Sequence, residues 1–96
     1  MAKDIMDKQL EELVNAILKI ETFEECKAFL TDICTIKELK DMAQRLEVAK
    51  MLRENIVYQK IATETGASTA TISRVSRALN YGSDGYAMIL DKLGDK

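Results

Sequence analysis

The chain has 96 residues, of which 47% are hydrophobic and only 5% aromatic, with a net charge of −2 and no proline, tryptophan or histidine. This length predicts one small domain, and an aliphatic composition without proline favours an all-α fold. Without histidine, the two cysteines, Cys26 and Cys34, are too few for a zinc site, and charged residues interrupt every apolar run that could form a signal peptide or a membrane span. We therefore expect a cytoplasmic protein with reduced thiols, no metal and no contact with membranes.

The first expected element is an amphipathic helix over residues 3–20. Its apolar stripe consists of Met6, Leu10, Leu13, Val14 and Ile17, widened by Leu18 and Ile20. The early acids Asp4 and Asp7 suit the positive end of the helix dipole. A small chain leaves much apolar surface exposed relative to its volume. We therefore expect this face to pack against a second copy of the chain.

Two S/T-x-x-E patterns mark the next helices. Thr22 with Glu25, and Thr35 with Glu38, have the spacing of a capping box, which satisfies amide groups at a helix N-terminus. The second helix is expected to turn inward Phe23, Cys26, Phe29, Leu30 and Ile33. The third helix, over about residues 36–53, is expected to bury a row made of Leu39, Met42, Ala43, Leu46, Ala49 and Leu52.

Residues 58–80, YQKIATETGASTATISRVSRALN, predict a helix-turn-helix. Ile61 and Ala62 give the first short helix an apolar side, and Gly66 can adopt a positive φ at the turn. Ser68 is the expected N-cap of the second helix of this motif, with Thr69 as the alternative. This second helix of the motif has one apolar stripe, made of Ile72, Val75 and Leu79. After it, Gly82 is expected to end the helix and Ser83 to cap a last helix with apolar Tyr86, Met88, Ile89 and Leu93.

The face opposite this stripe has the chemistry of a DNA-binding surface. Between Gln59 and Tyr81 the only acid is Glu64, and residues 49–81 have a net charge of +3, whereas residues 1–48 have −4. Small polar residues followed by arginines suit a helix that enters the major groove. The candidate DNA-binding residues are Gln59, Lys60, Ser68, Thr69, Ala70, Thr71, Ser73, Arg74 and Arg77. An ordinary αα-hairpin would need only the glycine and the apolar stripe.

The run GASTATISRVSRALN resembles the turn and recognition helix of the Trp repressor family, whose members carry a similar GA-x-x-ATI-[ST]-R pattern. Within that family the chain is most similar to the YerC/YecD-type branch. The resemblance extends from about residue 10 onward and is specific over residues 59–79. The helical patterns predict five to six helices in one domain, residues 1–96, and the resemblance implies that this domain forms an intertwined homodimer. Residues 1–57 would be dimerisation helices, 58–80 the helix-turn-helix and 83–93 a C-terminal helix.

The resemblance also implies a ligand site. In the tryptophan-binding members of that family, tryptophan is held by arginines of the third and recognition helices and by a threonine. Arg45, Arg74 and Thr71 match these positions, Arg45 after a one-residue shift of the alignment. However, Val75 replaces the glycine that leaves a slot for the indole ring, and Ala78 replaces a serine. We therefore expect no tryptophan co-repressor, and any small effector would use Arg45, Thr71 and Arg74.

Two other classes of function compete with DNA binding. An enzyme is not expected, because the sequence offers no histidine, no glycine-rich phosphate loop and no nucleophile motif. A helical protein-interaction module or dimeric scaffold that does not bind DNA is the stronger alternative. The acid-poor face of the predicted recognition helix favours a sequence-specific, DNA-binding transcriptional regulator, a repressor that acts as a homodimer.

Overall fold

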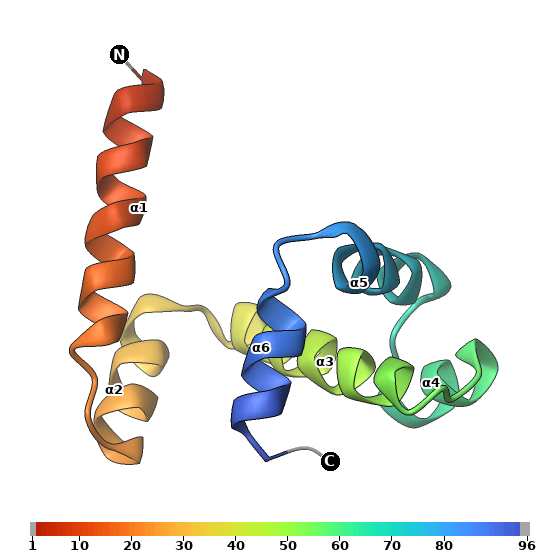
Figure 1. Cartoon of the computed structure of the whole chain (residues 1–96). Helices are drawn as coiled ribbons and strands as arrows, with labels where there is room; N and C mark the ends of the chain where they lie inside the picture. The colour runs from red at the N-terminus through yellow and green to blue at the C-terminus, as the bar shows by residue number, and fades with distance from the viewer. Residues whose placement is uncertain (1, 95–96) are drawn as a thin grey trace. The chain divides into compact units, whose positions relative to one another are not determined.

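The computed structural model describes residues 2–94, and these form six helices and no strand (Figure 1). The helices are α1 (Ala2–Leu18), α2 (Phe23–Ile33), α3 (Ile36–Arg53), α4 (Tyr58–Thr65), α5 (Thr69–Tyr81) and α6 (Gly85–Lys92). The predicted all-α fold is confirmed. None of the helices in residues 2–94 is both long and apolar enough to cross a membrane. The chain packs as two compact units, which divide between Ile36 and Lys37.

The N-terminal unit contains α1 and α2, and a capping box starts α2. The hydroxyl Oγ1 of Thr22 accepts a hydrogen bond of 3.0 Å from the backbone amide of Glu25. The side chain of Glu25 accepts a bond of 3.0 Å from the backbone amide of Glu21, one residue further back than in the usual motif. The predicted boundary of α2 is therefore confirmed, and α3 likewise begins directly after Thr35.

The apolar side of α1 is not covered within the chain. Leu10 is 57% exposed and Ile17 is 47% exposed, and of the predicted stripe only Ile20 is half-buried. In α2, Phe23 and Ile33 are 75% and 52% exposed, so the prediction that they point inward is wrong for the single chain. The other members of that predicted set, Cys26, Phe29 and Leu30, are half-buried. Both cysteines are free thiols.

The C-terminal unit, made of α3 to α6, contains the hydrophobic core. Its buried side chains come from all four helices and from the turn after α4: Val48, Ala49, Met51, Ile61, Ala67, Ile72, Val75 and Leu90. Leu52, Ile56, Ala62 and Tyr86 pack against this cluster and are half-buried. The helix-turn-helix is thus attached to the second half of α3 by aliphatic packing.

The predicted buried row of α3 is largely wrong. Only Ala49 of that row is buried, Leu39 and Leu52 are half-buried, and Met42, Ala43 and Leu46 are exposed. Val48 and Met51 are buried instead. The physical reason is that the second half of α3 joins the apolar core with α4 and α5 on the side that Val48 and Met51 occupy.

The chain between α5 and α6 turns differently from the prediction. Gly82 ends α5 as expected, and its amide donates to the carbonyl of Ala78 at 2.8 Å. A Cβ at Gly82 would lie 2.3 Å from that carbonyl oxygen, so close approach excludes any larger residue. Ser83 does not cap α6, because Asp84 adopts φ 64 and takes the N-cap position. In α6 the buried residue is Leu90, which the prediction did not include, whereas Met88, Ile89 and Leu93 are exposed.

Candidate nucleic-acid interface

Two local signals build the turn of the helix-turn-helix. Gly66 adopts the left-handed conformation, with φ 76, and its amide donates to the carbonyl of Ala62 at 2.9 Å. Two residues later, the hydroxyl of Ser68 accepts from the amide of Thr71 at 3.1 Å and so caps α5. Both predictions, the glycine turn and the serine cap, are confirmed.

The two helices of the motif are joined by a buried aliphatic seam. Ile61 of α4 and Ile72 of α5 are fully buried, and Val75 is 2% exposed. Ala62 is half-buried beside them, and its small side chain allows α4 and α5 to approach each other closely. This packing fixes which side of α5 remains in solvent.

The solvent side of α5 carries the predicted DNA-binding residues. Ala70, Ser73, Arg74 and Arg77, at helical spacings of three and four, line a hollow of about 320 Å³. Thr69 precedes them at the start of α5 and is exposed. The helix α5 contains no Asp or Glu. The structure therefore brings a small hydroxyl-bearing surface and two guanidinium groups onto one face.

Other predicted residues have partners within the motif. Ser68 also donates its hydroxyl proton to Oγ1 of Thr71 at 3.1 Å, and Thr71 is half-buried, so both side chains serve the cap. Lys60 lies 3.8 Å from the carboxylate of Glu64, and both side chains are more than half exposed. Such a surface ion pair contributes little stability, which leaves Lys60 able to reorient. Gln59 is exposed on α4.

A second, polar cavity lies between α3 and α5. It has a volume of about 210 Å³ and is lined by Lys37, Asp41, Gln44, Arg45, Thr71 and Arg74. The structure thus brings together the three candidate effector residues, although Arg45 was placed only after a shift of the alignment. Lys37, Asp41 and Gln44 were not among the predicted residues, although all three lie on α3 with Arg45.

The charges of this polar cavity are unbalanced. Lys37 donates to the carboxylate of Asp41 at 2.8 Å. This hydrogen bond, together with the positive charges of Lys37 and Arg45, lowers the pKa of Asp41. One carboxylate therefore faces three cations, Lys37, Arg45 and Arg74, and the cavity has an excess of positive charge.

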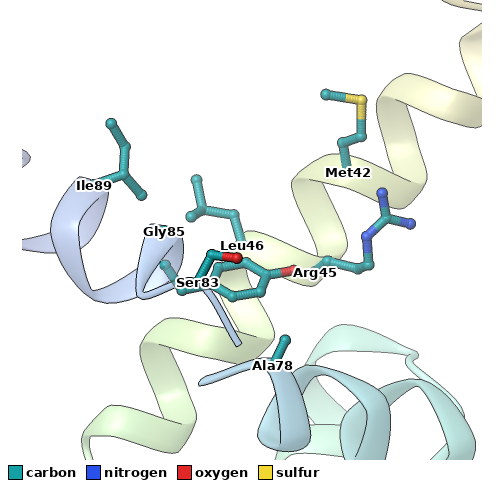
Figure 2. Close-up of a pocket in the computed structure, with 8 residues that line it drawn as sticks. Met42, Arg45, Leu46, Ala78, Ser83, Gly85 and Ile89 are labelled. Atoms are coloured by element: carbon teal, nitrogen blue, oxygen red, sulfur yellow. The ribbon is translucent and has the colours of Figure 1, made fainter. Parts of the chain in front are cut away.

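A third cavity, of about 520 Å³, is mainly apolar and lies between α3, the end of α5 and α6. Figure 2 shows Met42, Leu46 and Ile89 around it, with Ala78 on its α5 side and Arg45 beside Met42 on α3. Val75 does not line this cavity, because its side chain is buried in the core. Val75 is therefore an aliphatic core residue.

Comparison with known proteins agrees with this architecture. Residues 8–94 match the family model described as Trp repressor protein. The Uncharacterized protein YerC of Bacillus subtilis (strain 168) is 60% identical over 86 residues, which cover 90% of this chain and 83% of that protein. A crystal structure of a Staphylococcus aureus protein, provisionally assigned as a Trp repressor, superimposes with a TM-score of 0.88. It is 49% identical, and the match covers 93% of this chain and 89% of that one.

A second solved structure, of a TrpR like protein from Eubacterium eligens ATCC 27750, gives a TM-score of 0.86 at 53% identity. That match covers 91% of this chain and 90% of the other. The predicted resemblance to this family, and to its YerC-type members, is therefore confirmed, and it extends over nearly the whole chain. The chain belongs to the Trp repressor protein family.

Proposed function

We propose that the protein is a cytoplasmic, sequence-specific DNA-binding regulator of transcription, and that it acts as a repressor. One observation carries the proposal: a packed helix-turn-helix presents the acid-free, solvent-exposed face of α5, with small side chains near its N-terminus and two arginines further along. Membership of a family of regulators supports the same function.

The arrangement of α5 suggests how DNA would bind. The N-terminal part of a recognition helix enters the major groove, and Thr69, Ala70 and Ser73 are short enough to let the backbone approach base edges. Arg74 and Arg77 would contact phosphates, and so would amide groups at the start of α5. Gln59 and Lys60 on α4 would contact the sugar–phosphate backbone beside the groove.

We further propose that the functional species is a homodimer. The apolar stripe of α1 is exposed in the single chain, as are Met42 and Leu46 on α3 and Ile89 on α6. Exposed apolar surface of this extent is typical of interaction sites. The net charge of +3 in residues 49–81 is small, so two reading heads would be needed for useful affinity. The operator would then be a pseudo-palindrome with half-sites about 34–36 Å apart.

The phosphate contacts are tested by Arg77→Ala. This change is expected to weaken binding to specific and random duplexes alike, and to reduce the salt dependence of log K by about one unit for each subunit. The measurement is fluorescence anisotropy with an operator obtained by selection from random duplex DNA, at several salt concentrations. Lys27→Ala removes a cation from α2 and is the matched control, which should leave the slope unchanged.

Thr69→Ala provides the contrast, because it removes a hydroxyl that would contact bases and leaves the phosphate contacts in place. It should change the preferred sequence at constant salt slope. An unchanged slope in Arg77→Ala would contradict the phosphate assignment. Failure of the selection to enrich any duplex would instead favour a protein-interaction module.

We propose that tryptophan is not an effector of this protein. Val75 is 2% exposed and packs in the core, and forcing a ring into such a place costs about 1–3 kcal/mol or more. We expect isothermal titration to show no saturable tryptophan binding at micromolar concentration, and DNA affinity to be the same with and without tryptophan. The variant Val75→Gly is the control, since it should loosen α5 and could open a slot. Micromolar binding by the wild type would contradict this prediction.

A further inference from the structure

One polar contact connects α3 with the turn of the helix-turn-helix. The side-chain amide Nε2 of Gln44, on α3, donates to the backbone carbonyl of Thr65 at 3.1 Å, and this bond is partly buried. Thr65 is the last residue of α4. The same nitrogen lies 3.9 Å from the position that a Cβ of Gly66 would occupy, so the amide group lies directly against the turn.

The carbonyl of Thr65 is a group that needs such a partner. The last carbonyl groups of a helix have no amide within the helix to bond. Meanwhile the hydroxyl of Thr65 donates to the carbonyl of Ile61 at 2.8 Å and accepts from the amide of Ala67 at 3.1 Å. Thr65 therefore connects the end of α4 with the residue that leads into α5. A group that anchors Thr65 to α3 also anchors the start of α5.

The hydrophobic core supplies aliphatic contacts between α3 and the helix-turn-helix. They involve Val48 and Met51 on α3 and Ile61, Ile72 and Val75 on the motif. Apolar contacts are non-directional, so they resist separation of the helices more than they fix an angle. A hydrogen bond with a defined donor and acceptor geometry fixes orientation.

We propose that Gln44 is a positioning residue that keeps the helix-turn-helix in its DNA-binding orientation against α3 without a small effector. The proposal rests on the proposed function, and it concerns the regulation of that same surface. Gln44 lines the polar cavity together with Arg45, Thr71 and Arg74. An effector in that cavity would have to bridge α3 and the motif, and the Gln44–Thr65 bond already provides such a bridge.

The charges of the polar cavity explain why the bridge is needed. Arg45 on α3 and Arg74 on α5 line the same cavity, and the carboxylate of Asp41 is bonded to Lys37. Like charges that share a cavity repel each other, so Arg45 and Arg74 do not hold α5 against α3 by themselves. The bond from Gln44 holds the two together with an uncharged donor, which adds no further cation.

Gln44→Met is the decisive variant. Methionine has a similar length and helix propensity but no donor. If each subunit loses one hydrogen bond, operator affinity of the dimer should fall about tenfold, because the DNA-competent orientation becomes less populated. The salt dependence should stay at the wild-type value, since Gln44 would contact no phosphate. Gln9→Ala, an uncharged substitution on α1, is the control that should leave affinity unchanged.

Hydrogen exchange provides a second readout that needs no DNA. In Gln44→Met the amides of Gly66 and Ala67 should exchange several-fold faster, whereas those of α1 should not change. Gln44→Ala repeats the test with a smaller side chain, and thermal unfolding of both variants shows whether they are folded. Unchanged affinity together with unchanged exchange at the turn would overturn the proposal, as would a wild-type protein that binds its operator only after a small effector is added.

These outcomes separate this proposal from the proposed function. If the wild type binds no duplex DNA but exchange at Gly66 and Ala67 accelerates in both variants, the function is wrong and the bridge is real. If the wild type binds DNA and both variants match it in affinity and exchange, only the role of Gln44 is wrong.

Discussion

Leu10→Asp in α1 is expected to convert the proposed homodimer into monomers at micromolar concentration. Leu10 is 57% exposed in the single chain, so the change does not disturb the packing within the N-terminal unit. In a dimer that covers this stripe, the new carboxylate would be buried without a partner, which costs several kcal/mol. Light scattering measures the mass, and operator affinity should fall by at least about 100-fold, because each monomer brings only one reading head.

Asn15→Asp is the matched control, because it adds the same charge to the polar side of the same helix. It should leave both mass and DNA affinity unchanged. A wild-type protein that scatters as a compact monomer would contradict the proposed assembly. A dimer that survives Leu10→Asp would show that this stripe is not part of the interface.

The second large effect is expected from Ile72→Ala. Ile72 is fully buried between α4 and α5, and truncation of a buried isoleucine lowers the free energy of unfolding by about 2–5 kcal/mol. Urea denaturation followed by circular dichroism measures this loss. Because Ile72 holds α5 against α4, operator affinity should fall together with stability.

Ile36→Ala removes the same atoms from an exposed position at the start of α3, where Ile36 is 75% exposed. This control should change the free energy of unfolding by no more than about 0.5 kcal/mol. If Ile72→Ala were as stable as Ile36→Ala, the seam between α4 and α5 would not be the core of the motif.

The features that could be predicted from the sequence are those that a few neighbouring residues determine. The cap at Thr22 and the cap at Ser68 each depend on one hydroxyl and one amide three residues away. The turn at Gly66 depends on a single backbone conformation. Since each of these signals lies within about one helical turn, the sequence predicts them without knowledge of the fold.

The features that could not be predicted depend on distant residues. The periodicity of α3 is compatible with several buried faces, and only its packing against α4 and α5 selects Val48 and Met51. The cap of α6 was also mispredicted, because a serine before a helix gives the same signal whether or not Asp84 adopts a positive φ.

The candidate site likewise contains residues that the sequence predicts and a residue that it does not. The exposed face of α5 follows from helical spacing once the buried stripe is known, so Ser73, Arg74 and Arg77 could be found from the sequence. Gln44 could not be found from the sequence, since its side chain bonds a group 21 positions away. The acceptor is the backbone carbonyl of Thr65 and not its side chain. A bond to the backbone leaves no sequence pattern at its acceptor.

The cap at Ser68 has a consequence for how this position can change over evolutionary time. Asp, Asn, Ser and Thr all cap helices well, so the stability of α5 alone would accept any of the four. A helix that enters a DNA groove places its N-cap close to phosphates, where the carboxylate of Asp would be repelled and the three uncharged residues would not. If the protein binds DNA as proposed, folding and binding accept different sets of residues at position 68. Ser68→Asp would then separate the two, because the chain would fold but would no longer recognise its target.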